Sequence, residues 1–354
     1  MNLFDPFKLR GLSLRNRIAV SPMCMYSCVD GRVNDWHLVH LGSRAVGGAG
    51  LVIAEASAVS PEGRISPADA GLYREEHVAA WAPVTAFIRA QGAVPGVQLA
   101  HAGRKASTAA PWEGGRPVGA EAGGWSPLLA ASALAFNEAS QTPQALDLAG
   151  IEAIKAAFVQ AAQRALAAGF ELVELHAAHG YLLHQFLSPL SNRREDFYGG
   201  SFDNRTRLLR EIVTAVRAVW PERLPLLVRL SATDWADSDG WEIEQSIALA
   251  RQLGELGVDL IDVSSGGTLA RATIPVAPGF QVPFAARIRR EAGIATAAVG
   301  LITEPEQAQR IVAAGEADLV LLARELLRDP YWPYHAAKAL GQALASPPQY
   351  QRAW

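Results

Sequence analysis

The sequence predicts an α/β protein in which residues 1–354 fold as one domain, a (β/α)8 TIM barrel. Short apolar segments recur along the chain, and each is followed by a helical pattern. Strict alternation of this kind indicates a parallel sheet, and eight units favour its closure into a barrel. The eight segments are Arg17–Val20, Leu51–Ala54, Val94–Leu99, Leu172–Leu175, Leu226–Leu230, Leu260–Val263, Ala295–Val299 and Leu319–Leu322.

The helices between these segments carry recognisable signals. Apolar residues recur every three or four positions over Ile151–Ala165, which is typical of a helix with one buried face. Ser201 precedes a second such face, over Leu208–Val216, and is expected to be its N-cap. Thr303 is followed three residues later by Glu306, which predicts a capping box.

Two segments do not follow the strand–helix alternation. Residues 102–143 follow the third strand, contain many Gly and Pro residues and have no long helical period. Insertions of this length are usually functional or disordered, so we expect a lid at the barrel mouth. We expect Met1–Arg15 to close the opposite end of the barrel.

Composition excludes several classes of protein. Both charge signs are nearly balanced and the net charge is −3, which argues against a nucleic-acid partner. No signal peptide starts the chain, and no run reaches the roughly 18 apolar residues of a membrane span, so we expect a cytoplasmic protein without a membrane partner. The only cysteines are Cys24 and Cys28, too few for a disulfide framework, an iron–sulfur site or a structural zinc site.

The fourth strand ends in polar chemistry, with His176, His179 and Tyr181 directly after an apolar run. Active sites of parallel barrels lie at the carboxyl ends of the strands, so these side chains are candidates for catalysis. The two histidines are also candidate metal ligands in a barrel hydrolase, or simply capping groups. A metal site needs a third ligand, for which the candidates are Glu55, Asp234 and Asp262.

Two predicted strands contain polar groups in their interior, Gln98 and Arg229. A buried guanidinium without compensation costs several kcal/mol. Arg229 therefore needs either an anionic ligand or a carboxylate, for which Glu55 and Glu174 are candidates. After the last two strands, Gly300 and the Ala323-Arg324 pair lie where barrels commonly bind phosphate.

The combined pattern resembles the old yellow enzyme family of flavin-dependent ene-reductases, in its thermophilic-like bacterial subclass. The resemblance covers nearly the whole chain, and its motifs occur in the family's order. They are Arg15–Arg17, Ser21–Cys24, Glu55–Ser57, Gln98–Lys105, His176–Tyr181, Leu187–Asn192, Tyr198–Ser201, Asn204-Arg205, Arg324–Pro330 and the tail Gln349–Trp354.

The resemblance implies a non-covalent FMN. Arg229 matches the guanidinium beside flavin N1 and the C2 carbonyl, and Gln98 matches a contact to the pyrimidine side of the ring. Arg324 matches a phosphate ligand. The positions matching cofactor contacts are Ser21, Pro22, Met23, Cys24, Ala56, Gln98, Arg229, Gly300, Ala323 and Arg324. Ala323 replaces a residue that is usually glycine in the subclass.

The resemblance also implies a reaction, in which NADPH or NADH reduces the flavin and an activated alkene then reoxidises it in ping-pong order. His176 and His179 match the donors to the substrate's carbonyl or nitro oxygen, which makes them substrate-binding groups rather than metal ligands. Tyr181 matches the proton donor to the α-carbon, and Tyr26 matches a second substrate-contacting hydroxyl.

The tail, residues 346–354, matches a segment that enters a neighbouring subunit in this subclass. Arg352 stands where the family places an arginine in the partner's active site, which implies a homodimer or a homotetramer. Two alternatives stay open from the sequence. One is the metal-dependent hydrolase, and the other is a non-catalytic flavin-binding or redox-sensing protein that uses Cys24.

Overall fold

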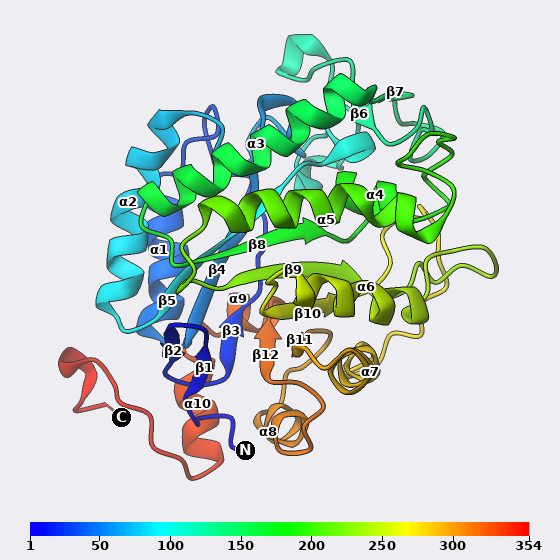
Figure 1. The fold of residues 1–354 in the computed structure, drawn as a ribbon. Helices are drawn as coiled ribbons and strands as arrows, with labels where there is room; N and C mark the ends of the chain where they lie inside the picture. Colours follow the sequence, from blue (N-terminus) through cyan, green and yellow to red (C-terminus); the bar gives the residue numbers. More distant parts are fainter. Residues whose placement is uncertain (354) are drawn as a thin grey trace.

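A closed barrel of eight parallel strands forms the centre of the computed structural model, which describes residues 1–353 (Figure 1). The strands follow one another around the barrel in chain order, and the last pairs with the first. They are β3 (Ile18–Val20), β4 (Leu51–Ala58), β5 (Val94–Ala100), β8 (Leu172–Ala177), β9 (Leu226–Ser231), β10 (Leu260–Ser264), β11 (Ala295–Ala298) and β12 (Leu319–Leu322). The predicted fold class is confirmed, and each of the eight predicted segments overlaps one barrel strand; β4 continues four residues beyond its predicted end at Ala54.

Helices surround the barrel (Figure 1). They are α1 (Asp35–Val46), α2 (Glu75–Ala90), α3 (Leu148–Ala167), α4 (Leu182–Leu187), α5 (Phe202–Val219), α6 (Ile243–Glu255), α7 (Val282–Ala292), α8 (Pro305–Ala313), α9 (Arg324–Arg328) and α10 (Trp332–Ala339). Within residues 1–353, no helix has both the length and the apolar character needed to cross a membrane.

One predicted helix cap is confirmed and one is wrong. Ser201 caps α5, because its side chain accepts the Asn204 N–H. Thr303 does not cap α8: the helix begins at Pro305, its N-cap is Glu304, and no side chain caps it. Proline at the first position has no N–H to be satisfied, and the Thr303 hydroxyl instead donates to the Glu304 carboxylate.

An N-terminal hairpin covers the amino ends of the barrel strands. Strands β1 (Phe7–Leu9) and β2 (Leu12–Leu14) pair antiparallel. Leu9 and Leu14 belong to the buried cluster that contains the first residues of several barrel strands, including Leu51. The expected closure of this end by Met1–Arg15 is therefore seen.

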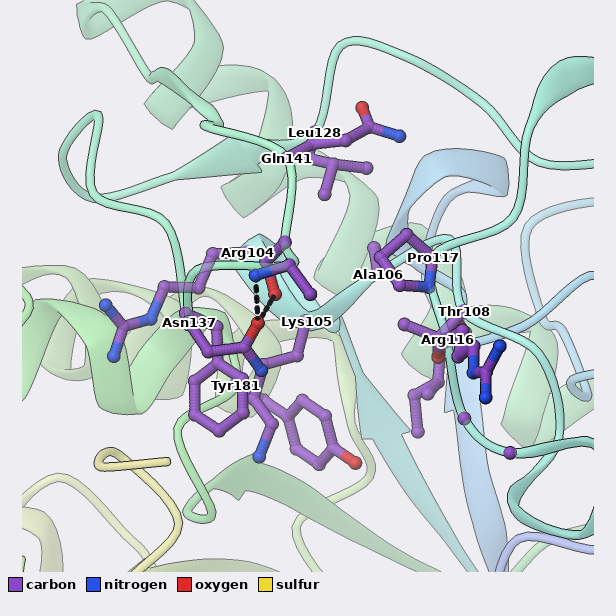
Figure 2. A pocket seen from close by; sticks show the side chains of 16 residues that line it. Arg104, Lys105, Ala106, Thr108, Arg116, Pro117, Leu128, Asn137, Gln141 and Tyr181 are labelled. Atoms are coloured by element: carbon purple, nitrogen blue, oxygen red, sulfur yellow. Dashed lines mark hydrogen bonds between the residues drawn. The ribbon is translucent and has the colours of Figure 1, made fainter. Parts of the chain in front are cut away.

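The segment between β5 and α3 lies at the opposite end of the barrel and contains little regular structure. It holds the short 3₁₀ turns η2 (Gly103–Lys105), η3 (Pro111–Glu113) and η4 (Ala120–Ala122), and the paired two-residue strands β6 (Leu129–Ala130) and β7 (Gln144–Ala145). Residues of this segment surround a cavity that also reaches Tyr181 (Figure 2).

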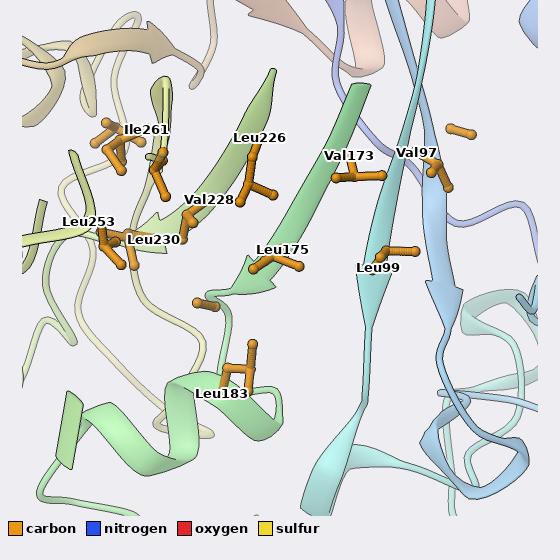
Figure 3. Close-up of a cluster of buried hydrophobic side chains, with 14 of the residues drawn as sticks. Val97, Leu99, Val173, Leu175, Leu183, Leu226, Val228, Leu230, Leu253 and Ile261 are labelled. Atoms are coloured by element: carbon orange, nitrogen blue, oxygen red, sulfur yellow. The ribbon is translucent and has the colours of Figure 1, made fainter. Parts of the chain in front are cut away.

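Side chains of the barrel strands alternate between two environments. One set, including Val173, Leu175 and Val228, packs against the helices (Figure 3). Each such leucine or valine contributes about 1.5–3 kcal/mol through burial. The other set faces the barrel interior, where Leu172 and Leu227 belong to the cluster nearest the hairpin. The next inward positions along these strands are polar, and they lead to the mouth.

Candidate active site

The two histidines at the end of β8 lie side by side. His176 is inside the strand, and His179 follows it with a φ of 59°. Their ring centroids are 5.2 Å apart and nearly perpendicular, and the Tyr181 ring lies 5.0 Å from that of His176. The backbone turn after β8 thus brings all three predicted catalytic side chains together at the barrel mouth.

Both imidazoles are neutral at physiological pH. Burial, and next the positive charge of Arg229, lower the pKa of His176 and the pKa of His179 well below the ordinary value. The Ala178 N–H donates to Nδ1 of His176 (3.3 Å), which places the proton of this neutral ring on Nε2. His176 therefore presents an N–H donor through Nε2.

His179 is engaged with a residue that the sequence did not single out. Its Nε2 lies 2.7 Å from Oγ of Ser264, at the end of β10. The Ser264 hydroxyl donates to Oε1 of Gln281, which leaves its oxygen free to accept from His179. His179 Nε2 is thus also a donor, and Ser264 is its acceptor in this structure.

The two tyrosines predicted to contact substrate are both protonated. Burial raises the pKa of Tyr181 well above its ordinary value, and burial likewise raises the pKa of Tyr26. Nζ of Lys105 lies 5.1 Å from the centre of the Tyr181 ring. Tyr26 packs edge-to-face on Trp112, with centroids 5.6 Å apart, so residue 112 of the long segment helps to position it.

A polar layer crosses the barrel interior below these rings. Gln98 and Glu174 are paired in register on β5 and β8, and Nε2 of Gln98 donates to Oε1 of Glu174 (2.8 Å). Glu174 is hydrogen-bonded to Asp262, and Nε of Arg229 lies 3.0 Å from Oδ2 of Asp262. The sequence proposed Glu55 or Glu174 as the partner of Arg229; the structure corrects this to Asp262, which is its register neighbour on β10.

Glu174 and Asp262 are carboxyl groups with no exposure to solvent. Burial, and next the negative charge of Asp262, raise the pKa of Glu174 to about 8, and burial raises the pKa of Asp262. Two adjacent carboxyl groups with one guanidinium hold one negative charge between them at neutral pH, because the pair retains a proton. The signal for this layer was present in the sequence: Glu174 precedes His176 by two residues and so shares its face of the strand.

The loop after β3 is held at the mouth by two contacts. The Ser21 N–H donates to the Leu322 carbonyl, and the Met25 N–H donates to Oε2 of Glu55. Burial, and next the charges of Asp69 and Glu55, raise the pKa of the Cys24 thiol well above its ordinary value. Cys24 is therefore a protonated thiol and a poor nucleophile.

The residues predicted to bind phosphate line one cavity of 270 Å³. Gly300, Ala323, Arg324 and Arg229 all contribute to it, together with Arg328. Gly300 has a φ of 125°, a backbone conformation that residues other than glycine rarely adopt, and a Cβ there would also lie 2.9 Å from Nε2 of Gln281. Guanidinium groups next to a glycine turn suit a phosphate ester, and the cavity extends to Arg229 and thus to the polar layer. These residues fit FMN.

Ala56 joins the same mouth, because it pairs with Gln98 across β4 and β5 just after a register shift in β4. Pro22 and Met23 lie in the loop between Ser21 and Cys24 and are partly buried. Arg352 is different. It is exposed in the turn after η5 (Pro348–Tyr350), and the tail packs on its own subunit, where the Tyr350 ring lies 6.1 Å from that of Tyr331 at the start of α10. Trp354 lies outside the described residues.

The three candidate third metal ligands have other partners. Glu55 pairs with His37 (3.0 Å), Asp234 pairs with His184 (3.1 Å), and Asp262 pairs with Arg229. The neutral rings of His176 and His179 instead each carry one N–H donor, and that of His179 is directed at Ser264. The geometry therefore suits hydrogen bonding to an oxygen rather than metal coordination.

A parallel barrel with paired neutral donors and an arginine-lined cavity that suits a phosphate ester is typical of barrels that bind a nucleotide cofactor across their mouth. The sequence profile described as the NADH:flavin oxidoreductase / NADH oxidase family (Oxidored_FMN) matches residues 2–342, and the chain belongs to this family. It is an enzyme, an oxidoreductase that uses FMN and a reduced nicotinamide as hydride donor. The metal-dependent hydrolase reading is wrong.

Individual relatives agree with this membership. An NADPH dehydrogenase from Geobacillus sp. (strain WCH70) is 50% identical over 99% of this chain and 98% of its own length. Morphinone reductase in complex with tetrahydroNAD is 29% identical with a TM-score of 0.78, over 99% of this chain and 93% of that one. A 2-naphthoyl-CoA reductase complex has a TM-score of 0.86 at 26% identity; this chain covers 52% of its length.

Proposed function

We propose that this enzyme reduces C=C bonds conjugated to a carbonyl or nitro group, with NADPH or NADH as the hydride donor. When bound, FMN supplies the hydride that it has taken from the nicotinamide. The observation that carries the proposal is the group formed by His176, His179 and Tyr181, in which the neutral His176 ring lies 5.2 Å from the neutral His179 ring and 5.0 Å from the protonated Tyr181 phenol.

The imidazole pair binds the electron-withdrawing oxygen of the alkene. Negative charge develops on that oxygen as the β-carbon is reduced, and N–H groups directed at it stabilise the transition state more than the ground state. Because both rings are neutral, each provides one donor without an uncompensated charge. His179 must exchange Ser264 for the substrate oxygen as its acceptor.

Tyr181 donates the proton that completes the reduction at the α-carbon. Its raised pKa keeps the hydroxyl protonated until the substrate becomes basic, as required of a general acid. Tyr26, held by Trp112, supplies a second hydroxyl that contacts the substrate.

The residues proposed to bind the cofactor lie around the barrel mouth. Gly300, Ala323 and Arg324 hold the phosphate, while Gln98 and Arg229 contact the ring from the polar layer. The opposite edge of the ring's binding site is formed by Ser21, Pro22, Met23, Cys24 and Ala56. Since the thiol of Cys24 is protonated, it acts as a neutral neighbour of the ring, and a redox-sensing thiolate is disfavoured.

Residues 102–143 serve as the lid of this site. The second part of the proposal concerns residues 346–354, which reach into the site of a second copy. The enzyme is then a homodimer or homotetramer in which Arg352 is donated across the interface. An apolar surface next to Cys24 supports the second part. Trp36, Val39, Trp112 and Leu327 are exposed around one cavity of 660 Å³ that Cys24 and Met25 also line. Exposed apolar clusters of this kind mark interaction surfaces. A cytoplasmic location completes the proposal.

The test is a pair of separated half-reactions. The purified holoenzyme is reduced without oxygen by NADPH or NADH, and the reduced enzyme is then mixed with an enone, a maleimide and a nitroalkene. Flavin absorbance should be bleached by the nicotinamide and restored by the alkene, with formation of the saturated product. Bleaching without restoration by any of the alkenes contradicts the proposed reaction while leaving the family membership intact.

A further inference from the structure

The cavity between the long segment and Tyr181 is lined by positive charge. It has a volume of 350 Å³, and its walls include Arg104, Lys105 and Arg116, whereas no aspartate or glutamate of the described chain lines it. Figure 2 shows Lys105, Asn137 and Tyr181 on one side of this space and Thr108, Pro117 and Arg116 on the other. Nothing in the cofactor or hydride chemistry described above uses these three cations.

These cations have no carboxylate partner among residues 1–353. Lys105 donates through Nζ to the carbonyls of His179 (2.9 Å) and Gly267 (3.2 Å). Arg104 donates to the carbonyl of Thr268 (2.7 Å), and its Nε is buried without an acceptor. Both cations also lie near the face of the Phe136 ring, which attracts positive charge weakly. Neutral groups thus accept the hydrogen bonds of Lys105 and Arg104, and the Asp234 carboxylate attracts Arg104 without forming an ion pair with it.

This arrangement has an energetic consequence for Lys105. Burial, and next the neighbouring charge of Arg104, lower the pKa of Lys105 to about 8. Adjacent cations that are partly removed from water repel each other, and neither Lys105 nor Arg104 forms an ion pair that would offset its desolvation. An anion bound in the cavity that both line is attracted by both cations and reduces their mutual repulsion.

The remaining walls suit the same kind of ligand. Thr108, Asn137, Ser140 and Gln141 add neutral groups that donate hydrogen bonds. The volume lies within the range of small-molecule pockets and exceeds what one water molecule needs. Because Tyr181 forms part of the wall, whatever occupies the cavity is next to the proposed proton donor.

We propose that this cavity is a subsite for an oxyanion, a carboxylate or phosphate carried by the molecule whose reacting part lies against Tyr181. The inference rests on the proposed function for the location of the reacting part. Two sources share this chemistry: an alkene that bears an anionic substituent, and the phosphate groups of the nicotinamide dinucleotide. Lys105 and Arg116 bind the anion, and Arg104, which lines the same cavity, adds a third positive charge.

The first arm of the test uses pyrophosphate as the probe and needs no turnover. Pyrophosphate is titrated by calorimetry into the FMN-loaded protein at pH 8.5, in buffers of different ionisation enthalpy. Binding should be accompanied by proton uptake, because an anion raises the pKa of Lys105. Lys105→Met and Arg116→Gln should each weaken binding about tenfold, as expected for one charge-assisted hydrogen bond. Lys8→Met, at the exposed edge of the N-terminal hairpin, should change neither binding nor proton uptake.

The second arm identifies the source through the two half-reactions. Reduction rates are compared for NADPH, NADH and reduced nicotinamide mononucleotide, and reoxidation rates for 2-cyclohexenone with and without a ring carboxylate. If Lys105→Met no longer prefers the carboxylated enone, the alkene is the molecule that carries the bound anion. Loss of the preference for the dinucleotide identifies the coenzyme.

Three outcomes decide the matter. Absence of pyrophosphate binding overturns the proposal, and so does binding that leaves both preferences unchanged in the variants. Lys105-dependent binding with proton uptake and an altered preference for NADPH or NADH, in an enzyme that reduces no alkene, supports the subsite and contradicts the proposed reaction instead.

Discussion

Nε2 of His179 lies 2.7 Å from Oγ of Ser264, so one donor of the imidazole pair already has an acceptor. A ligand oxygen must replace that acceptor, which costs part of one hydrogen bond, about 1 kcal/mol. Ser264→Ala should therefore tighten phenolic ligands about fivefold, measured by titration of their charge-transfer band with the flavin. Ser265→Ala, whose hydroxyl donates to Gln281 and not to His179, is the control and should leave the affinity unchanged.

Tyr181→Phe should separate the two half-reactions. Removing the proton donor is expected to slow reoxidation by an enone about 10²–10⁴-fold, the usual contribution of general acid catalysis. Reduction by the nicotinamide needs no proton from Tyr181 and should change less than about twofold. Stopped-flow flavin absorbance measures both rates, and Tyr198→Phe, whose hydroxyl bonds Glu211 beyond the barrel wall, serves as the control. Equal slowing of both half-reactions would contradict the assignment.

The buried carboxyl pair should make stability depend on pH. The pKa of Glu174 is raised from 4.5 to about 8, so the folded chain holds a proton that the unfolded chain loses. The corresponding stability is fully present below about pH 4.5 and is lost as the pH rises towards 8 and beyond. The glutamine in Glu174→Gln cannot ionise. From pH 5 to pH 9, the decrease in the free energy of unfolding should therefore be about 1–3 kcal/mol smaller in this variant than in the wild type.

Urea unfolding of the FMN-loaded protein at several pH values measures this difference. Glu222→Gln, at an exposed position, is the control and should follow the wild-type profile. Parallel pH profiles for Glu174→Gln and the wild type would show that the pair is already ionised in the folded protein.

Gly300→Ala should weaken cofactor retention. Alanine at a φ of 125° is strained by about 1–3 kcal/mol, and its Cβ would meet Gln281 at 2.9 Å. Gly293→Ala has a φ of 71° but open space around the added Cβ, so it tests backbone strain alone. Both variants should lose stability, and only Gly300→Ala should release FMN more readily, as followed by flavin fluorescence on dilution. Comparable FMN loss in both variants would remove Gly300 from the phosphate cradle.

Arg352→Ala should raise the KM for alkenes several-fold if the tail enters a partner's site. Gln351→Ala, one residue earlier in the same exposed turn, should not. Sedimentation at the assay concentration distinguishes loss of the side chain from loss of the oligomer. Unchanged kinetics in Arg352→Ala with an intact oligomer would reject the cross-subunit role.

The barrel was predictable because its signals are local. Each strand is a short apolar run, each run is followed by a helical period, and Ser201 stands directly before the helix that it caps. The capping error at Thr303 has a local cause too. Pro305 fixes the first turn of α8 two residues later, and the Thr-x-x-Glu spacing takes no account of it.

The contacts across the barrel were less predictable. Arg229 was expected to need a partner, but Asp262 is 33 positions away and meets it only through the register of β9 and β10. Ser264 had no signal at all, because a serine at a strand end is unremarkable until the neighbouring strand brings His179 to it. Lys105 was visible only as part of a motif, and its lack of a carboxylate partner is a property of the folded chain.

The N-terminal hairpin covers the end of the barrel opposite the mouth, and this placement has a practical consequence. Met1 is exposed next to that hairpin, on the side of the barrel away from the mouth. A purification tag or surface linker joined to Met1 lies at the end of the barrel opposite the active site and leaves the barrel mouth open. The same fusion at the C-terminus would be attached to the residues proposed to enter the active site of a second copy. Immobilised preparations are therefore best attached through Met1.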